Sequence, residues 1–321
     1  MRAIIYEGAG GIEVVRLAER PTPEPGPGQI RVRVRAAGLN RADIVQRRGH
    51  YAAPPGWPAD IPGLEYAGEV ESLGAGVSRW SIGDRVMGLV GGGAQAEFVV
   101  TAEAEALAVP DGIDWPAAAA IPEAFLTAYD ALVTRGRLQA AERVLIHAAA
   151  GGVGTAAVQV AAMWAGVVIG TSRSADKLAK LVPLGLTQGI DVSRHGFREQ
   201  LGEPVDLVLD SLGGPAFADN LAVLRQRGRL VMIGFLAGSA FSGDLGPLLR
   251  HRLQVIGTMM RSRGPEERSE LAADWRRDLA PGFESGKLQP VVGAEVPFER
   301  IGEAHALMEQ DALFGKCVLI W

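Results

Sequence analysis

From residue 143 onward, strand-like and helix-like segments alternate along the chain. Apolar runs of strand type, such as RVLIH at 143–147, VVIGTS at 167–172 and VDLVLDS at 205–211, are separated by segments of helical character. Such alternation is typical of βαβ units, in which each helix crosses over between two parallel strands. The sequence therefore predicts a doubly wound parallel sheet with α/β architecture.

The first 120 residues have a different pattern. Short strand-like runs are separated by turns, and IRVRVRA at 30–36 alternates apolar and charged residues with the period of a half-buried strand. This part predicts a small, mostly β barrel or sandwich. Near residue 115 helical segments begin, with Asp114 as a plausible N-cap residue and a second helix expected over 123–134. The tail, with a strand, a helix from about residue 300 and a closing strand, is expected to return to the first part.

We therefore expect three segments. Residues 1–121 form the mostly β domain, residues 122–262 form the nucleotide-binding sheet, and residues 263–321 return to the first domain. The chain has 321 residues, which suggests two domains or one large domain with an appended lobe, and 48% are hydrophobic, which is enough for a sizeable core. Its formal net charge of -5 argues against nucleic acid as a partner, since no positive field attracts phosphate.

Cysteine usage and the ends of the chain limit the other classes. Cys317 is the only cysteine, so no internal disulfide and no cysteine zinc site is expected. The five histidines, His50, His147, His195, His251 and His305, have no spacing typical of metal ligands. The N-terminus has no signal-peptide pattern, and we expect a cytoplasmic protein.

A membrane-spanning helix is the alternative for residues 144–170, which contain no Asp, Glu, Lys or Arg. Gly and Ala at 149–152 interrupt this stretch, and it separates into a strand, a helix and a second strand. We therefore expect no membrane span.

The loop AAAGGVG at 148–154 lies between the first of these strands and a helix that we expect to begin at Gly154. It approximates the dinucleotide fingerprint G-x-G-x-x-G, with Ala149, Gly151 and Gly154 at the glycine positions. Gly151 would let the backbone approach a pyrophosphate, and Gly154 would let the helix pack closely on the strand. The pyrophosphate would then lie at the positive end of the helix. A tight turn without a ligand is the alternative.

The end of the next strand predicts which dinucleotide binds. NAD-binding proteins carry an acidic residue about 20 residues after the fingerprint. Here Thr171, Ser172, Arg173 and Ser174 stand at the tip of the strand, with Lys177 one helical turn later. Hydroxyl groups and cations suit a 2′-phosphate, so the sequence favours NADPH over NADH. Ordinary solvated cations are the alternative for Arg173 and Lys177.

Several motifs together identify a family resemblance. GLNRADIVQRRGHYAAPPG, GLEYAGEVESLGAGV, AAAIPEAFLTAYDAL, VLIHAAAGGVGTAAVQVA and GKCVLIW resemble, in order, the signatures of zinc-independent quinone oxidoreductases of the medium-chain dehydrogenase/reductase superfamily. These are relatives of zeta-crystallin, and the chain most resembles their stress-inducible branch. The resemblance implies a GroES-like β-barrel domain beside the Rossmann sheet, a homodimer, and hydride transfer from NADPH to small quinones or similar conjugated carbonyl acceptors.

The resemblance also implies particular site residues. Asn40 and Tyr51 match family residues that border the cleft and would donate hydrogen bonds to the acceptor oxygen. Cofactor contacts are expected from the residues Thr127, Gly151, Gly152, Val153, Gly154, Ser172, Arg173, Lys177, Gly234 and Phe235. We interpret Asp43 as satisfying local hydrogen bonds rather than acting as a base.

Two departures from related sequences qualify this expectation. Leu64 stands where zinc-dependent members have a histidine ligand, so no metal is expected. Val192 stands where many relatives have a tyrosine near the 2′-phosphate, so the NADPH preference is expected to be moderate. The alternatives are a reductase of enals or enoyl thioesters in the same superfamily, and a nucleotide-binding protein with a structural or RNA-binding role.

Overall fold

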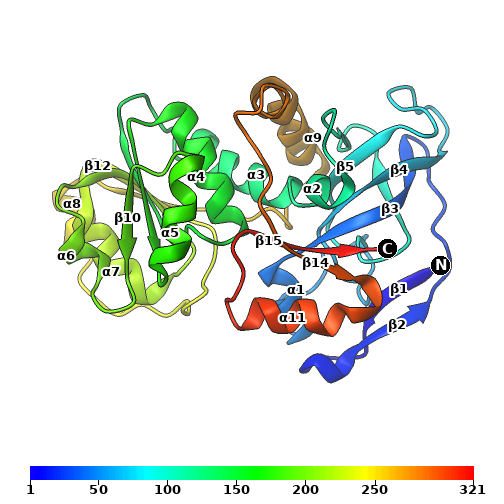
Figure 1. Ribbon diagram of the computed structural model, residues 1–321, viewed down its shortest axis with the longest axis horizontal. Helices are drawn as coiled ribbons and strands as arrows, with labels where there is room; N and C mark the ends of the chain where they lie inside the picture. The colour runs from blue at the N-terminus through cyan, green and yellow to red at the C-terminus, as the bar shows by residue number, and fades with distance from the viewer. The chain divides into compact units, whose positions relative to one another are not determined.

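The computed structural model describes residues 1–321, which form two compact units (Figure 1). Unit 1 contains Met1–Glu123 and Met260–Trp321, and unit 2 contains Ala124–Met259. The end of the chain thus belongs to the same unit as its beginning.

Unit 2 is built on a six-stranded sheet in which every neighbouring pair is parallel. The strand order is β10-β9-β8-β11-β12-β13, so the chain moves outward from the centre in one direction and then in the other. With right-handed crossovers, this order places the connecting helices on opposite faces of the sheet. The predicted doubly wound sheet is therefore confirmed. The strands are β8 (Arg143–Ile146), β9 (Val167–Ser172), β10 (Gln188–Asp191), β11 (Val205–Asp210), β12 (Leu224–Met232) and β13 (Gln254–Gly257).

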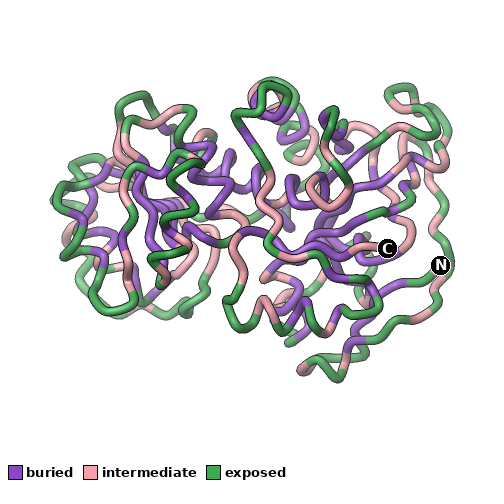
Figure 2. The backbone as a smooth tube through the Cα atoms, viewed as in Figure 1, coloured by how far each residue is buried: buried purple, intermediate pink, exposed green.

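Central strands β8 and β11 are buried except for the partly exposed Arg143 and Asp206, as parallel strands with helices on both faces should be. Figure 2 shows the buried residues concentrated along the strands, and Val144, Leu145 and Ile146 are 0% exposed. The surrounding helices are α3 (Pro122–Tyr129) with its continuation at Asp130–Arg135, α4 (Gly152–Trp164), α5 (Ala175–Leu181), α6 (Phe197–Gln200), α7 (Gly214–Val223) and α8 (Gly246–Arg250). Helix α4 begins at Gly152, two residues before the predicted start, so that expectation was wrong.

Unit 1 contains a seven-stranded sheet centred on the long strand β3. Its neighbours follow the order β14-β15-β3-β4-β5-β7, and β6 also pairs with β3. In β3 the apolar residues Ile30, Val32 and Val34 are buried, as the alternating pattern predicted. The strands are β3 (Gln29–Leu39), β4 (Glu65–Leu73), β5 (Arg85–Leu89), β6 (Phe98–Ala102), β7 (Leu107–Ala108), β14 (Val292–Pro297) and β15 (Lys316–Ile320).

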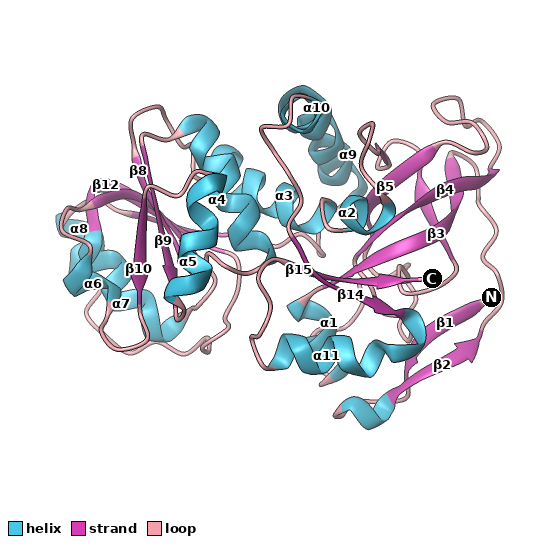
Figure 3. Cartoon of the chain, in the orientation of Figure 1, coloured by secondary structure: helices cyan, strands magenta, loops and turns pink.

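The chain's last strand, β15, pairs antiparallel with β3, more than 270 residues earlier in the sequence. A separate antiparallel pair is formed by β1 (Arg2–Tyr6) and β2 (Val15–Glu19). The helices of unit 1 are α1 (Arg41–Arg47), α2 (Trp115–Ala119), α9 (Pro265–Asp274), α10 (Ala280–Glu284) and α11 (Ile301–Glu309) (Figure 3). Asp114 caps α2 as predicted, because its carboxylate accepts a hydrogen bond from the Ala117 N–H at 2.9 Å.

No helix combines the length and the apolar character that a membrane span requires. The uncharged stretch at 144–170 divides into β8, α4 and β9, and α4 has 13 residues.

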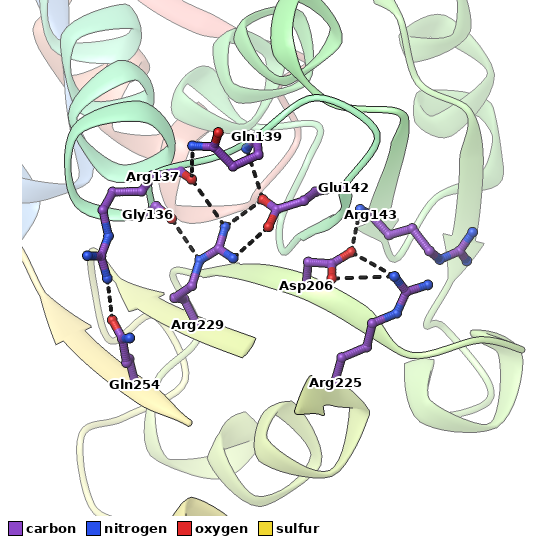
Figure 4. A network of polar contacts seen from close by, with 9 residues as sticks. All are labelled: Gly136, Arg137, Gln139, Glu142, Arg143, Asp206, Arg225, Arg229 and Gln254. Carbon is purple, nitrogen blue, oxygen red and sulfur yellow. Dashed lines mark hydrogen bonds and ion pairs between the residues drawn. The ribbon is translucent and has the colours of Figure 1, made fainter. Parts of the chain in front are cut away.

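An ion-pair network ties the amino ends of the central strands of unit 2 to the loop that precedes β8 (Figure 4). Arg229, in β12, donates two hydrogen bonds to the Glu142 carboxylate, at 2.7 and 2.6 Å, and a third to the Gly136 carbonyl oxygen. Asp206, in β11, accepts from the Arg143 N–H and from the Arg225 guanidinium. Bidentate arginine–carboxylate pairs are the stronger kind of salt bridge. The network therefore fixes the loop against two neighbouring strands.

We expect the substitution Glu142→Gln to lower the free energy of unfolding by about 1–3 kcal/mol at neutral pH, because a charged acceptor of Arg229 is lost. Burial raises the pKa of Glu142, but the hydrogen bonds from Arg229 and Gln139 lower it by a larger amount. The pKa of Glu142 is therefore below its ordinary value of 4.5. The stabilisation is therefore present above that value and is lost as the pH falls through the lower folded-state pKa.

Urea unfolding at pH 7 and at acidic pH measures both effects. The matched control is Glu203→Gln, because Glu203 is 72% exposed and lies 3.6 Å from Arg143. This control should change the free energy of unfolding by less than about 0.5 kcal/mol. Equal effects of the two substitutions at pH 7 would contradict the role of Glu142.

Candidate active site

The glycine-rich loop of unit 2 ends in a helix start that is suited to an anion. Gly151 is the N-cap residue of α4, with extended backbone angles and no side-chain cap. The first turn of α4 contains no acidic residue. The first N–H groups of a helix have no partner within the helix, and the helix dipole makes this end positive. The loop can therefore hold a phosphate group through its backbone.

Gly154 is required for the close approach of α4 to the preceding turn. A Cβ atom at this position would lie 2.6 Å from both the Cα and the carbonyl carbon of Ala149. A Cβ atom at Gly151 would lie 3.4 Å from the Ala148 carbonyl oxygen, which is an ordinary contact. The structure therefore supports the predicted packing role of Gly154. Binding of a dinucleotide pyrophosphate at this loop stays a prediction.

His147 immediately precedes this loop and is buried. Its Nδ1 lies 3.0 Å from the Thr171 hydroxyl and its Nε2 lies 2.7 Å from the Asn220 amide oxygen. Burial lowers the pKa of His147, so the ring stays neutral and its two nitrogens can serve as one donor and one acceptor. The ring thus joins the segment after β8 to β9 and α7.

The predicted ribose-phosphate residues lie together at the end of β9 and the start of α5. The Ser172 hydroxyl accepts the Ser174 N–H at 3.2 Å, and the Ser174 hydroxyl caps α5 by accepting the Lys177 N–H at 3.3 Å. A hydroxyl that accepts a hydrogen bond can still donate its own hydrogen. Arg173 is exposed and Lys177 is half-buried. The group therefore offers two hydroxyl donors and two cations at one strand end.

A carboxylate lies one strand away from this group. Asp191, at the end of β10, is the partner of Ser172 in the parallel register. Its carboxylate accepts the Ser193 N–H at 2.8 Å, and this bond lowers the pKa of Asp191. Val192 follows, and its N–H donates to the Ser172 carbonyl oxygen. This neighbouring negative charge was not predicted, because Asp191 lies beyond the tip of β9 in the sequence.

Three further predicted cofactor residues belong to unit 2. Gly234 and Phe235 follow the end of β12, and the Phe235 side chain is 57% exposed. Thr127 is buried in α3. Ligands of open α/β sheets collect at the carboxyl ends of the strands, where Gly234 and Phe235 lie. A contact of these residues with nicotinamide stays a prediction.

In unit 1, Asn40 belongs to a buried polar cluster. Its amide Nδ2 donates to the Glu65 carboxylate at 2.9 Å and more weakly to the Gly38 carbonyl oxygen at 3.4 Å. Its amide oxygen accepts from the Lys316 ammonium group. Both amide hydrogens therefore have an acceptor within unit 1. The hydrogen bond to the Gly38 carbonyl oxygen is long, so this hydrogen can be shared with a second acceptor. Donation from Asn40 to a substrate stays a prediction.

Glu65 and Lys316 form the centre of this cluster. The Glu65 side chain is 0% exposed, and its carboxylate pairs with Lys316 and also accepts the Glu123 N–H at 2.8 Å. Lys316, which is 5% exposed, donates as well to the Leu39 carbonyl oxygen. A charge in such a place requires a partner of opposite sign and further hydrogen bonds, and both are present.

Asp43 has the structural role that we expected. Its carboxylate accepts the N–H groups of Asn40, at 2.7 Å, and of Gly63, at 3.2 Å. Burial raises its pKa to about 6. Asp43 thus joins the start of α1 to the segment that leads into β4.

Tyr51 lies in an irregular segment after α1 and is held there by Arg261. The Arg261 guanidinium donates to the Tyr51 carbonyl oxygen at 2.8 Å and lies 4.8 Å from the centre of its ring. The Tyr51 hydroxyl makes no hydrogen bond within the protein. Burial raises its pKa to about 12, so the hydroxyl keeps its proton at neutral pH and can act as a donor. Beside Arg261 lies a small hollow that is also lined by Leu64, Gly91 and Glu123.

No group of three or more His, Cys, Asp or Glu side chains in the structure is arranged to hold a metal ion. Leu64, at the position of a family zinc ligand, is 3% exposed and lines the hollow.

The predicted residues thus divide between the two units, with Asn40 and Tyr51 in unit 1 and the cofactor residues in unit 2. Sequence reasoning missed Glu65 and Lys316 as members of the candidate site. Lys316 belongs to GKCVLIW and Glu65 to GLEYAG, two motifs that carried the family resemblance, but no spacing in the sequence shows that they meet.

Comparisons with known proteins agree with this architecture. Residues 26–111 match the family "Alcohol dehydrogenase GroES-like domain" and residues 184–319 match "Zinc-binding dehydrogenase". The human synaptic vesicle membrane protein VAT-1 homolog is 33% identical, covering 100% of this chain and 86% of its own. The quinone oxidoreductase of Lama guanicoe is 32% identical, covering 100% and 97%. The crystal structure of Escherichia coli quinone oxidoreductase complexed with NADPH is 30% identical, with a TM-score of 0.90 and full coverage of both chains.

We expect Gly154→Ala to weaken dinucleotide binding at least tenfold, because its Cβ atom would push α4 away from the Ala148–Ala149 turn. The matched control is Gly151→Ala, which adds the same methyl group three residues earlier without a steric conflict. Quenching of tryptophan fluorescence by NADPH measures both dissociation constants. If Gly154→Ala binds as tightly as Gly151→Ala, the close approach is not needed for the site.

We expect Lys316→Met to lower the free energy of unfolding by about 3–5 kcal/mol, because the Glu65 carboxylate would stay buried without a cation. The double substitution Glu65→Gln with Lys316→Met removes both charges and should recover most of this loss. Chemical denaturation of both variants and of Glu65→Gln alone measures the coupling. Additive losses would show that the two charges do not depend on each other.

Proposed function

The chain belongs to the medium-chain dehydrogenase/reductase superfamily of oxidoreductases, and from that premise we propose that it is a zinc-independent, NADPH-dependent quinone oxidoreductase. The observation that supports dinucleotide binding is the start of α4. Its first turn has no side-chain cap and no acidic residue, and it contains Gly154, where any other side chain would clash with the preceding turn. The similarity to an NADPH-bound quinone oxidoreductase supports the choice of substrate.

Each predicted residue then has a physical role. The backbone of Gly151, Gly152, Val153 and Gly154 binds the pyrophosphate, and Ser172, Arg173 and Lys177 bind the 2′-phosphate. Thr127, Gly234 and Phe235 line the nicotinamide side. NADPH, when bound, supplies the hydride that reduces the acceptor.

The remaining task of the chain is to stabilise the reduced acceptor. Negative charge develops on the acceptor oxygen as it is reduced, and a preorganised donor stabilises this charge more in the transition state than in the ground state. The Tyr51 hydroxyl is protonated and makes no hydrogen bond within the protein, so we assign it as the main donor. The second amide hydrogen of Asn40 is the auxiliary donor.

Steady-state oxidation of NADPH, followed at 340 nm in the presence of a chelator, tests the proposal. The acceptor panel contains ortho- and para-quinones, enals and enoyl thioesters. Turnover with quinones supports the proposal, whereas turnover with enals or enoyl thioesters alone would assign the chain to the alternative reductases. Tight NADPH binding without turnover of any acceptor would indicate a nucleotide-binding protein, and activity that is lost with chelator would contradict zinc independence.

The cofactor preference rests on Arg173 and Lys177. A hydrogen bond to a charged group contributes about 1.5–3 kcal/mol, so Arg173→Ala and Lys177→Ala should each raise the KM for NADPH roughly 10- to 100-fold. The KM for NADH should hardly change, since NADH lacks the 2′-phosphate. We expect the unsubstituted preference for NADPH to be moderate, because Asp191 places a negative charge opposite Ser172. Unchanged NADPH-to-NADH ratios in both variants would place the phosphate elsewhere.

We also propose a homodimer that forms through β13. This strand forms one edge of the unit 2 sheet, and its Val255 side chain is 41% exposed. Leu249, in helix α8 before this strand, is 84% exposed. Pairing an apolar edge across a two-fold axis would cover it. Light scattering at micromolar concentration should give the dimer mass, and Val255→Lys should shift it toward the monomer. A monomer mass for the unsubstituted protein would contradict the proposal.

A further inference from the structure

Arg261 is a buried cation that has no carboxylate partner. Its side chain is 6% exposed, yet its three hydrogen bonds go to uncharged oxygens: the Gly91 carbonyl, the Tyr51 carbonyl and the Gln46 side-chain amide. No ion pair joins it to an acidic residue. Two other buried cations of unit 1 are paired, Arg47 with Glu309 and Lys316 with Glu65, and half-buried Arg268 is paired with Glu105.

Burial of a charge without an ion-pair partner is unfavourable in free energy. A purely structural crosslink would therefore be more stable with an uncharged side chain. Burial also lowers the pKa of Arg261, and the nearby charges of Asp43 and Glu123 offset only part of this shift. The charge is instead directed at an aromatic ring, since the guanidinium carbon lies 4.8 Å from the centre of the Tyr51 ring. A cation over the face of a phenol is attracted to the ring, and its field favours loss of the phenolic proton.

The same guanidinium fixes the position of this ring. Its hydrogen bonds at 2.7 to 2.8 Å join helix α1 at Gln46, the irregular segment at Tyr51 and the loop at Gly91. Residues 48–64 contain no helix or strand, so the segment that carries Tyr51 has no backbone ladder of its own. A donor that is misplaced by about 1 Å can lose much of its effect on the transition state.

We propose that Arg261 is the positioning residue for Tyr51, which holds the ring in place and, through its unpaired charge, makes the hydroxyl a stronger hydrogen-bond donor to the acceptor oxygen. The inference rests on the proposed function of Tyr51. Arg261 itself transfers nothing, and Tyr51 keeps its proton throughout, since it donates a hydrogen bond only. A neighbouring arginine provides the contrast, because Arg268 lies 5.5 Å from the Trp57 ring but is paired with Glu105.

A double-mutant cycle tests this with Arg261→Met, Tyr51→Phe and the double variant. Each single substitution should lower kcat about tenfold or more and leave the dissociation constant for NADPH within about twofold. In the Tyr51→Phe background, Arg261→Met should change kcat by less than about twofold, because its action passes through the missing hydroxyl. Arg261→Lys keeps the charge and should fall between the parent and Arg261→Met. Arg268→Met is the control, and any effect on kcat should be the same in both backgrounds.

A second readout does not depend on turnover. The chain has 4 tyrosines, so fluorotyrosine labelling gives few ¹⁹F resonances, and the one that disappears in Tyr51→Phe belongs to Tyr51. Arg261→Met should shift and broaden this resonance, while Arg268→Met should leave it in place. An unmoved resonance in Arg261→Met would overturn the inference.

The outcomes separate this inference from the proposed function. If Tyr51→Phe lowers kcat but Arg261→Met acts to the same extent with and without the hydroxyl, Arg261 is not a positioning residue and Tyr51 keeps its role. If Tyr51→Phe leaves kcat unchanged, the donor role of Tyr51 fails, and the inference about Arg261 fails with it.

Discussion

The buried carboxylate of Glu65 is the contact on which unit 1 depends. It accepts hydrogen bonds from the side chain of Asn40 and from the backbone at the start of α3, and it pairs with Lys316 in the last strand. Even the sequence of β3 is adapted to it, because a Cβ atom at Gly38 would collide with the Glu65 carboxylate and lie 2.7 Å from the Ala119 carbonyl oxygen. Segments from both ends of the chain therefore meet at one charged group, and removal of its partner would leave that charge buried and uncompensated.

Such a cluster also determines the orientation of a side chain. The two ends of the Asn40 amide differ, since one carries an acceptor oxygen and the other carries donor hydrogens. The Lys316 ammonium group requires the Asn40 amide oxygen to face it, and the Glu65 carboxylate requires the Asn40 amide nitrogen to face it. Only one rotamer of the amide satisfies both, so the ion pair fixes the side chain that we predicted as a substrate contact. Stability and placement are here consequences of the same bonds.

Local patterns in the sequence predicted the elements that depend on local physics. The alternating residues of β3, the cap at Asp114 and the apolar strands of unit 2 follow from periodicity and capping, which a few neighbouring residues determine. The glycine-rich loop was recognised because its steric requirement is also local, although α4 begins two residues earlier than predicted. Helices α1 and α9 were missed, since α9 is rich in charged residues and buries only Leu271 and Ala272. Asp191 was missed because its proximity to Ser172 comes from strand pairing.

The contacts between residues that lie far apart in the sequence could not be predicted, for a related reason. Arg261 and Tyr51 are 210 residues apart, and Lys316 and Asn40 are 276 residues apart, so no motif contains both partners. What distinguishes these two buried cations is also invisible in the sequence. Lys316 is compensated by Glu65 and can be explained by stability alone, whereas Arg261 is bonded to uncharged oxygens and stacked on an aromatic ring. Because folding gains least from a buried cation without an ion-pair partner, its presence beside Tyr51 is better explained by what its field does to the phenol than by the bonds that hold it.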